Sequence, residues 1–172
     1  MKKAFIFIAI AFSTFTAKTQ ESSSKIKLYA VNAGLGSFHF QKDVNGHDGI
    51  SITTDLTLSL NKNLISASYL AGTSIKILDG PNYNFEEYSI LYGREWKVVD
   101  WFRFEGFAGI GHFNQNSKNI DIGDASTISF PLRVNTKFYF SKNFGMGFNS
   151  NYSINSVNNN FSTNLIFHYK FN

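Results

Sequence analysis

The sequence of 172 residues lacks cysteine altogether, has only two prolines and is poor in charge. Without cysteine, it can form neither a disulfide framework nor a thiolate zinc site, and it has no thiol for acylation. Charged residues make up 16% of the chain, whereas a soluble surface alone usually carries about 25–35%. Beyond the first twenty residues no apolar run approaches the roughly 18 residues of a spanning helix. Phosphate loops, dinucleotide fingerprints and nucleic-acid motifs are also missing.

Aromatic residues, in contrast, are abundant. The chain contains 19 Phe and 8 Tyr, and aromatic residues make up 17% of it. Such a composition is incompatible with a disordered chain, because it provides ample apolar surface for burial. The length predicts a single domain.

The first twenty residues have the anatomy of a signal peptide. Lys2 and Lys3 form a positive start, residues 4–12 are apolar, and residues 13–20 are small and polar. We therefore expect residues 1–20 to be removed, with cleavage between Ala17 and Gln20, leaving a domain of residues 21–172. The alternative is a buried N-terminal strand or helix. Because part of the net charge of +4 belongs to this leader, we infer no nucleic-acid partner.

The rest of the chain alternates between apolar and polar residues with a period of two, which predicts β-strands rather than helices. In one example, Ile50 and Ile52 alternate with Ser51 and Thr53. Segments bounded by turn residues predict eight strands. These expected strands cover residues 26–37, 49–60, 64–76, 85–98, 101–113, 127–140, 143–155 and 161–171. Glycines in the fifth strand predict bulges or bends at Gly106, Gly109 and Gly111.

The connections alternate between short turns and longer polar segments. The short turns are expected at residues 61–63, 99–100 and 141–143, and the longer segments near 38–48, 77–84, 114–126 and 156–160. This alternation is typical of an up-and-down antiparallel transmembrane barrel, with periplasmic turns and extracellular loops. An even number of strands places both termini at the same end.

The two faces of the strands indicate which side meets lipid. The polar faces consist mostly of Ser, Thr, Asn and Gly, which suits a crowded interior, and the apolar faces contain almost no Lys or Glu. Aromatic residues gather at strand ends, as in an interfacial girdle. Arg94 shares an apolar face and is expected to extend toward the membrane interface. A soluble sandwich with cross-strand aromatic pairs is the alternative.

Three segments carry a resemblance to a known group. Residues 88–94 (YSILYGR), 107–111 (FAGIG) and 128–132 (ISFPL) resemble parts of the outer membrane protein beta-barrel domain grouping. Over residues 25–172 the chain is similar to small eight-stranded barrels such as OmpX and the OmpA transmembrane domain. The resemblance implies an all-β, eight-stranded antiparallel barrel in the bacterial outer membrane, without implying an activity. These barrels commonly end in Phe, whereas this chain ends Phe171-Asn172.

Inward-facing charges predict a polar network that fills the lumen, because charges in a low-dielectric interior need partners. This set comprises Asp55, Glu87, Glu95, Lys97, Arg103, Glu105, Arg133, Lys137, His168 and Lys170. A structural plug is the first interpretation, and a proton or ion pathway or catalytic carboxylates are the alternative. On the plug interpretation, Arg103→Ala destabilises the barrel more than Lys142→Ala.

Barrels of this kind include lipid A deacylases and palmitoyl transferases, so the resemblance also allows an enzyme. The deacylase pattern is His-x-Ser, in which the histidine activates the serine. Here His112 is followed by Asn114 at that position, with Ser117 further along, and we assign no catalytic residue. His39, Asp43, His47 and Asp48, and residues 119–124, are weak candidates for metal or calcium sites. We predict no metal and no cofactor.

Together these features predict a monomeric outer-membrane protein with a structural or surface-interaction role in envelope integrity, adhesion or reception, with specificity in the loops. Expected partners are outer-membrane lipid, the barrel assembly machinery and an extracellular ligand. The alternatives are an enzyme acting on lipid A and a conduit for small hydrophobic molecules. For the conduit, only Leu70, Leu91 and Phe107 suggest an apolar lumen.

Overall fold

The computed structural model describes residues 26–41, 48–74, 83–117 and 124–171. They form eight β-strands in one domain. The strands are β1 (Lys27–Phe40), β2 (Asp48–Leu60), β3 (Asn63–Ser74), β4 (Tyr83–Val99), β5 (Phe102–Ser117), β6 (Ala125–Tyr139), β7 (Phe144–Asn155) and β8 (Asn160–Lys170). Within the described ranges no helix is long and apolar enough to cross a membrane. The expected signal peptide lies outside these ranges.

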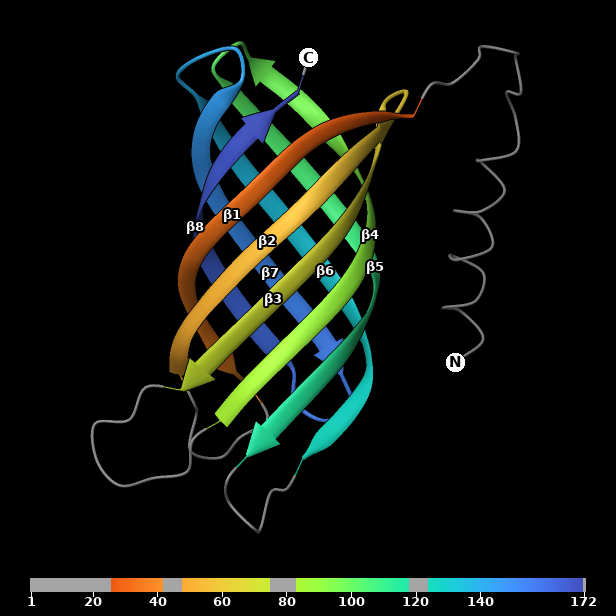
Figure 1. Ribbon diagram of the computed structural model, residues 1–172, viewed down its shortest axis with the longest axis vertical. Helices are drawn as coiled ribbons and strands as arrows, with labels where there is room; N and C mark the ends of the chain where they lie inside the picture. The colour runs from red at the N-terminus through yellow and green to blue at the C-terminus, as the bar shows by residue number, and fades with distance from the viewer. Residues whose placement is uncertain (1–25, 42–47, 75–82, 118–123, 172) are drawn as a thin grey trace.

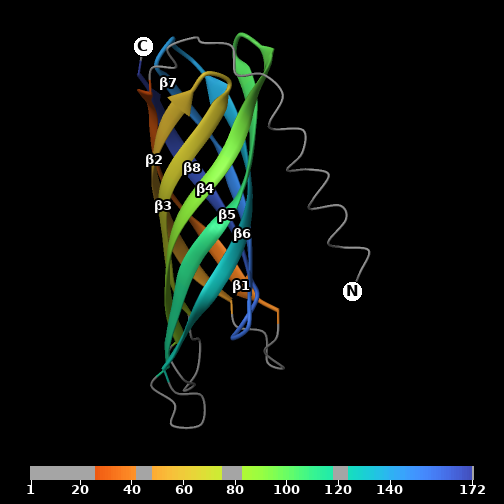
Figure 2. The same cartoon turned by 90° about the vertical axis from the view of Figure 1, so that its right-hand side faces the viewer.

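Each strand pairs antiparallel with its sequence neighbour, and β1 pairs with β8 to close the barrel. Figure 1 shows the tilted strands wound around a common axis. In both views, the end of β8 and the short turns lie at one end of the barrel, and the strand ends that flank the long connections lie at the other (Figures 1 and 2). We call these the turn end and the loop end. The predicted eight-stranded antiparallel topology is confirmed.

All eight predicted strands are present, and their ends differ most at the loop end. There β1 continues to Phe40 instead of residue 37, and β5 continues to Ser117 instead of residue 113. Both extensions keep the inward alternation, because Phe38, Phe40 and Gln115 are buried. The connections that follow β1 and β5 are therefore shorter than the sequence predicts.

The outer surface is apolar. On β6 the exposed hydrophobic side chains are Ile128, Phe130, Leu132, Val134 and Phe138, followed by Phe140 in the turn. At about 3.3 Å per residue and a tilt near 40°, the stretch from Ile128 to Phe140 spans roughly 30 Å along the axis. That height matches the hydrocarbon core of a bilayer. Arg94 is exposed on this outer face, close to the turn end, as predicted.

The glycines of β5 do not mark bulges, which corrects the prediction. The β4–β5 register is regular opposite Gly106, Gly109 and Gly111, and shifts only between Lys97 and Val99. At Gly109 an added Cβ would lie 2.1 Å from the carbonyl oxygen of Ile90. Glycine is therefore required there because two backbones approach closely.

Candidate functional site

The lumen centre contains a buried ion pair. Arg133 Nη1 on β6 donates to Asp55 Oδ2 on β2 at 3.4 Å, and both side chains are only 2% exposed. Arg133 Nη2 donates to Ser68 Oγ at 2.5 Å. Asp55 also accepts hydrogen bonds from Asn32 Nδ2 at 2.6 Å and Thr57 Oγ1 at 3.2 Å. The carboxylate is thereby compensated by a cation and by neutral donors, as a buried charge requires.

A second ion pair lies nearer the turn end. Lys137 Nζ is 2.7 Å from Glu105 Oε1, and Asn135 Nδ2 donates to Glu105 Oε2 at 2.9 Å. Asn149 Nδ2 in turn donates to Asn135 Oδ1 at 2.8 Å. All four side chains are buried. This network links β5, β6 and β7 across the interior.

Glu95 organises the charges at the turn end. It accepts a hydrogen bond from the Tyr29 hydroxyl and from Arg103 Nη1 at 2.8 Å, and Lys170 Nζ lies 3.7 Å away. Lys97 does not join this group, which corrects the prediction for that residue. Its side chain is 54% exposed at the rim and pairs with Asp100, because β4 there extends beyond its pairing with β3, which ends at Arg94.

His168 bridges two residues of the network. Its Nε2 is 2.5 Å from the Tyr139 hydroxyl, and its Nδ1 is 2.5 Å from Asn32 Oδ1. Glu87 differs from the other lumen acids, because its carboxylate accepts hydrogen bonds from two serine hydroxyls, those of Ser129 and of Ser153 at 2.6 Å. Among the described residues Glu87 has no ion pair. The predicted inward residues other than Lys97 thus contribute to the interior.

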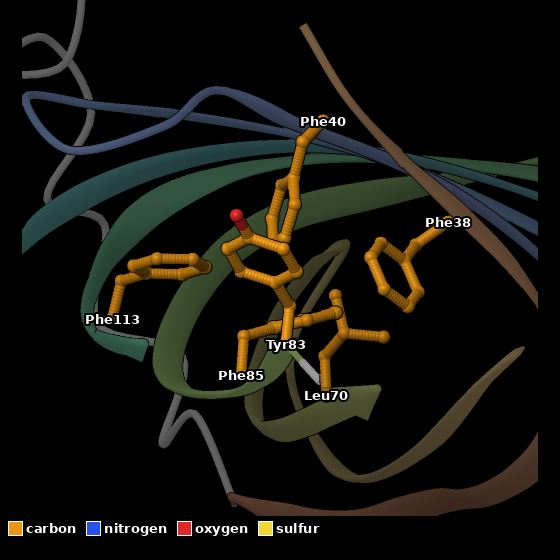
Figure 3. Packing of buried hydrophobic residues seen from close by; sticks show 6 residues of the cluster. All are labelled: Phe38, Phe40, Leu70, Tyr83, Phe85 and Phe113. Atoms are coloured by element: carbon orange, nitrogen blue, oxygen red, sulfur yellow. The ribbon is translucent and has the colours of Figure 1, made fainter. Parts of the chain in front are cut away.

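An aromatic cluster fills the lumen at the loop end, and of its members only Leu70 was expected there from the sequence. Figure 3 shows side chains from β1, β3, β4 and β5 converging: Phe38, Phe40, Leu70, Tyr83, Phe85 and Phe113. Phe38 and Phe85 pack edge to face with centroids 4.7 Å apart, and Phe85 stacks on Phe113 at 5.7 Å. We call this group the aromatic plug. The alternation of Phe38 and Phe40 with exposed His39 was the signal that could have revealed it.

The wall of the lumen formed by β7 and β8 is polar. Buried side-chain atoms without a protein partner are concentrated on β7 and β8, at Asn149, Asn151, Asn160, Ser162 and Asn164. Of the conduit candidates, Leu70 belongs to the aromatic plug, while Leu91 and Phe107 pack with Leu64 in a separate cluster. The lumen is therefore apolar at one end and lined by amides along one side.

The outer face near the loop end carries a histidine–serine pair. His112 Nε2 on β5 lies 3.1 Å from Ser126 Oγ on β6, and both residues are exposed. A groove of about 360 Å³ beside His112 is lined partly by Tyr88, Ile90 and Ile110. No carboxylate among the described residues has a hydrogen bond to His112. Ser117, the serine considered from the sequence, has no described side chain.

The metal candidates are only partly described. His39 Nδ1 is 2.5 Å from Asp48 Oδ1 on the exposed rim. Asp43, His47 and residues 119–123 lie outside the described residues. Within the described part of the chain no group of three or more His, Asp or Glu residues could hold a metal ion.

Known structures show which fold this is. Neisserial surface protein A matches with a TM-score of 0.73, covering 86% of this chain and 99% of that one at 10% identity. This chain has the fold of the small outer-membrane β-barrels. Ail of Yersinia pestis, in complex with the heparin analogue sucrose octasulfate, has a TM-score of 0.59 and 16% identity, with 83% and 97% coverage.

A third outer-membrane barrel, the N-terminal domain of Pseudomonas aeruginosa OprF, matches with a TM-score of 0.58 at 16% identity, covering 86% of this chain and all of that one. No protein-family model and no curated protein matches the sequence. The resemblance to small eight-stranded outer-membrane barrels is therefore confirmed for the fold. The apolar belt of this barrel agrees with it, because strands cross a bilayer only when their outward residues are apolar.

Proposed function

We propose that this protein is a closed barrel of the bacterial outer membrane that presents its loop end outward as a surface for interaction. The observation that carries this proposal is the filled lumen, in which the aromatic plug lies above the ion pairs of Asp55 and Glu105. An eight-stranded barrel has an interior just wide enough for its own side chains. Function then resides in the loops and rims, because the strands are constrained by lipid.

The charge of the loop end favours a neutral or basic partner. The described rim carries Asp48, Glu86 and Asp124 and no Lys or Arg. In the sequence of the long loops, Lys42, Lys76 and Lys118 are matched in number by Asp43, Asp79 and Asp121. A polyanion such as the sulfated ligand of the Ail structure is therefore disfavoured here. We propose adhesion to, or reception of, a partner with an uncharged or basic surface.

Single cysteines can test the location and orientation, since the chain has none of its own. Asp121→Cys lies in a long loop and Lys142→Cys in a short turn. A membrane-impermeant maleimide should label the first variant on intact cells and the second only after lysis. The folded protein should also shift on a denaturing gel when heated. If only the turn variant is labelled on intact cells, the barrel has the opposite orientation to the one proposed.

The closed lumen has its own test. Reconstituted in planar bilayers, the wild-type barrel should give no discrete conductance steps. A variant with a trimmed plug, Phe85→Ala/Phe113→Ala, serves as the comparison. Stable conductance from the wild type would favour the conduit over the surface role.

The His112–Ser126 pair supports a second candidate, an enzyme acting on outer-leaflet lipid. A histidine within hydrogen-bond reach of a serine has the geometry of a base and its nucleophile, and both residues are on the lipid-facing side. Mass spectrometry of lipid A from cells with and without the protein tests this candidate. If the protein lowers the mass of lipid A and the Ser126→Ala variant does not, the enzyme is supported. If lipid A is unchanged by the wild-type protein, the enzyme is excluded and the surface role stands.

A further inference from the structure

Positive charge is concentrated at the turn end. Of the described Lys and Arg residues, all except the buried Arg133 and Lys137 lie there: Lys27, Lys62, Arg94, Lys97, Arg103, Lys142 and Lys170. Among the described acids, Glu95, Asp100 and the buried Glu105 lie toward that end, and Glu105 is already paired with Lys137. The turn end is therefore strongly basic, opposite to the acidic rim at the loop end. Such a field attracts anions to the leaflet on this side.

A cavity of about 570 Å³ opens within this basic region. It lies between the start of β5, the end of β6, the β6–β7 turn and the end of β8. Its cationic side chains are Arg103, Lys142 and Lys170. Tyr139, Trp101 and Phe140 form its aromatic lining.

The cations of the cavity exceed the anions available to neutralise them. Arg103 and Lys170 share a single carboxylate, that of Glu95. Asp100, the acid in the cavity lining, is paired with Lys97. Lys142 has no ion pair with any described residue and is exposed. The cavity consequently carries an uncompensated positive charge, which an anionic ligand would neutralise.

The same cavity borders the hydrocarbon region. Trp101 is 59% exposed and Phe140 65% exposed, and Trp101 stacks on the outward-facing Phe138 with centroids 6.2 Å apart. Aromatic side chains at this position mark the membrane–water interface. A ligand here would meet positive charge on one side and an apolar aromatic surface on the other. Phospholipids with a net negative headgroup have this combination.

We propose that this cavity binds the phosphate of an anionic phospholipid in the leaflet at the turn end, with Trp101 and Phe140 against its glycerol and upper acyl chains. Lys142 supplies the free cation, and Arg103 and Lys170 supply the charge shared with Glu95. The site would hold one lipid at a defined place on the barrel circumference. It is independent of whatever partner the loops bind.

Native mass spectrometry of the detergent-solubilised full-length barrel can test the site. The probes are dioleoylphosphatidylglycerol and, for comparison, zwitterionic dioleoylphosphatidylcholine. Lys142→Glu changes the free cation of the cavity, and Lys62→Glu makes the same change in the β2–β3 turn, outside the cavity. Both residues are exposed in turns, and the heat shift on a gel verifies that each variant is folded. Lys142→Gln provides a milder second variant.

We expect one phosphatidylglycerol to be retained in preference to phosphatidylcholine. Lys142→Glu should weaken its retention about tenfold, and Lys62→Glu less than about twofold. Equal losses in both variants would show a diffuse surface attraction and overturn the site. Absence of a headgroup preference in the wild type would do the same. Displacement of the lipid by excess inorganic phosphate would assign the cavity to a soluble anion instead.

Discussion

The imidazole of His168 and the carboxylate of Asp55 are joined through the side-chain amide of Asn32. Asn32 Nδ2 donates to Asp55 at 2.6 Å, which leaves Asn32 Oδ1 to accept from His168 at 2.5 Å. His168 Nδ1 must then carry the proton, and in a neutral ring Nε2 accepts from the Tyr139 hydroxyl. A carboxylate on β2 thus determines the tautomer of a histidine on β8.

This chain of hydrogen bonds predicts an imidazole with a proton on Nδ1. Nitrogen chemical shifts of His168 in the reconstituted barrel should show that tautomer. Asn32→Leu removes the link and should lower the free energy of unfolding by about 1–3 kcal/mol, because buried partners lose their hydrogen bonds. An Nε2-protonated ring in the wild type would contradict the assigned order of donors.

The central ion pair predicts a large cost for removing one partner. Arg133→Met leaves Asp55 uncompensated in the interior and should lower stability in lipid by about 3–5 kcal/mol. Lys142→Met, in the exposed turn, should change it by less than about 0.5 kcal/mol. Arg103→Ala should fall between them, because Arg103 is partly exposed and Lys170 remains near Glu95.

A double variant separates charge from packing at that pair. Asp55→Asn combined with Arg133→Met removes the unpaired charge and should recover part of the lost stability. Urea unfolding of the reconstituted barrels measures the stability of the double variant and of the three single variants, Arg133→Met, Lys142→Met and Arg103→Ala. Equal midpoints for Arg133→Met and Lys142→Met would contradict a structural role for the lumen charges.

Two glycines with different surroundings test the close approach of the strands. At Gly36 an added Cβ would lie 1.9 Å from the carbonyl oxygen of Thr163, so Gly36→Ala must push β1 and β8 apart. At Gly106 the nearest atom, 3.3 Å away, belongs to the Trp96 side chain. The heat-shifted folded fraction on a gel should fall in Gly36→Ala and stay near the wild-type value in Gly106→Ala.

The aromatic plug predicts a strong dependence on Phe85. Phe85→Ala removes a ring that packs against Phe38, Phe40 and Phe113 and should cost about 3–5 kcal/mol. Phe85→Leu retains much of the volume and should cost less than half as much. Urea midpoints in lipid distinguish the two. Identical midpoints for Phe85→Ala and the wild type would show that the plug does not stabilise the barrel.

The ion pair of Lys97 and Asp100 at the β4–β5 turn predicts a lowered pKa that depends mainly on these two residues. A hydrogen bond from Lys97 holds the pKa of the exposed Asp100 carboxyl below its usual range. The pair therefore exists at neutral pH and is lost as the pH falls through the lowered pKa. Lys97→Met should raise the pKa of Asp100 in a carboxyl-carbon NMR titration. An unchanged pKa would show that the pair does not persist in solution.

Much of the fold was predictable from local pattern. Strand periodicity sorts residues such as Leu132 and Arg133 onto opposite faces without any knowledge of their neighbours. The scarcity of charge then indicates that the apolar face meets lipid. The turn and loop lengths supplied the up-and-down topology, since adjacent antiparallel strands need only short connections.

The pairing inside the lumen was decided by the tertiary structure. Lys97 and Lys137 both have inward parity along their strands, yet only Lys137 is enclosed, because height on the tilted barrel determines burial. Phe38 and Phe113 meet in the plug although they are distant in sequence. Alternation along a strand specifies whether each residue faces the lumen or the lipid. The closure of the sheet, with its fixed shift in register between strands, specifies which residues of different strands lie at the same height.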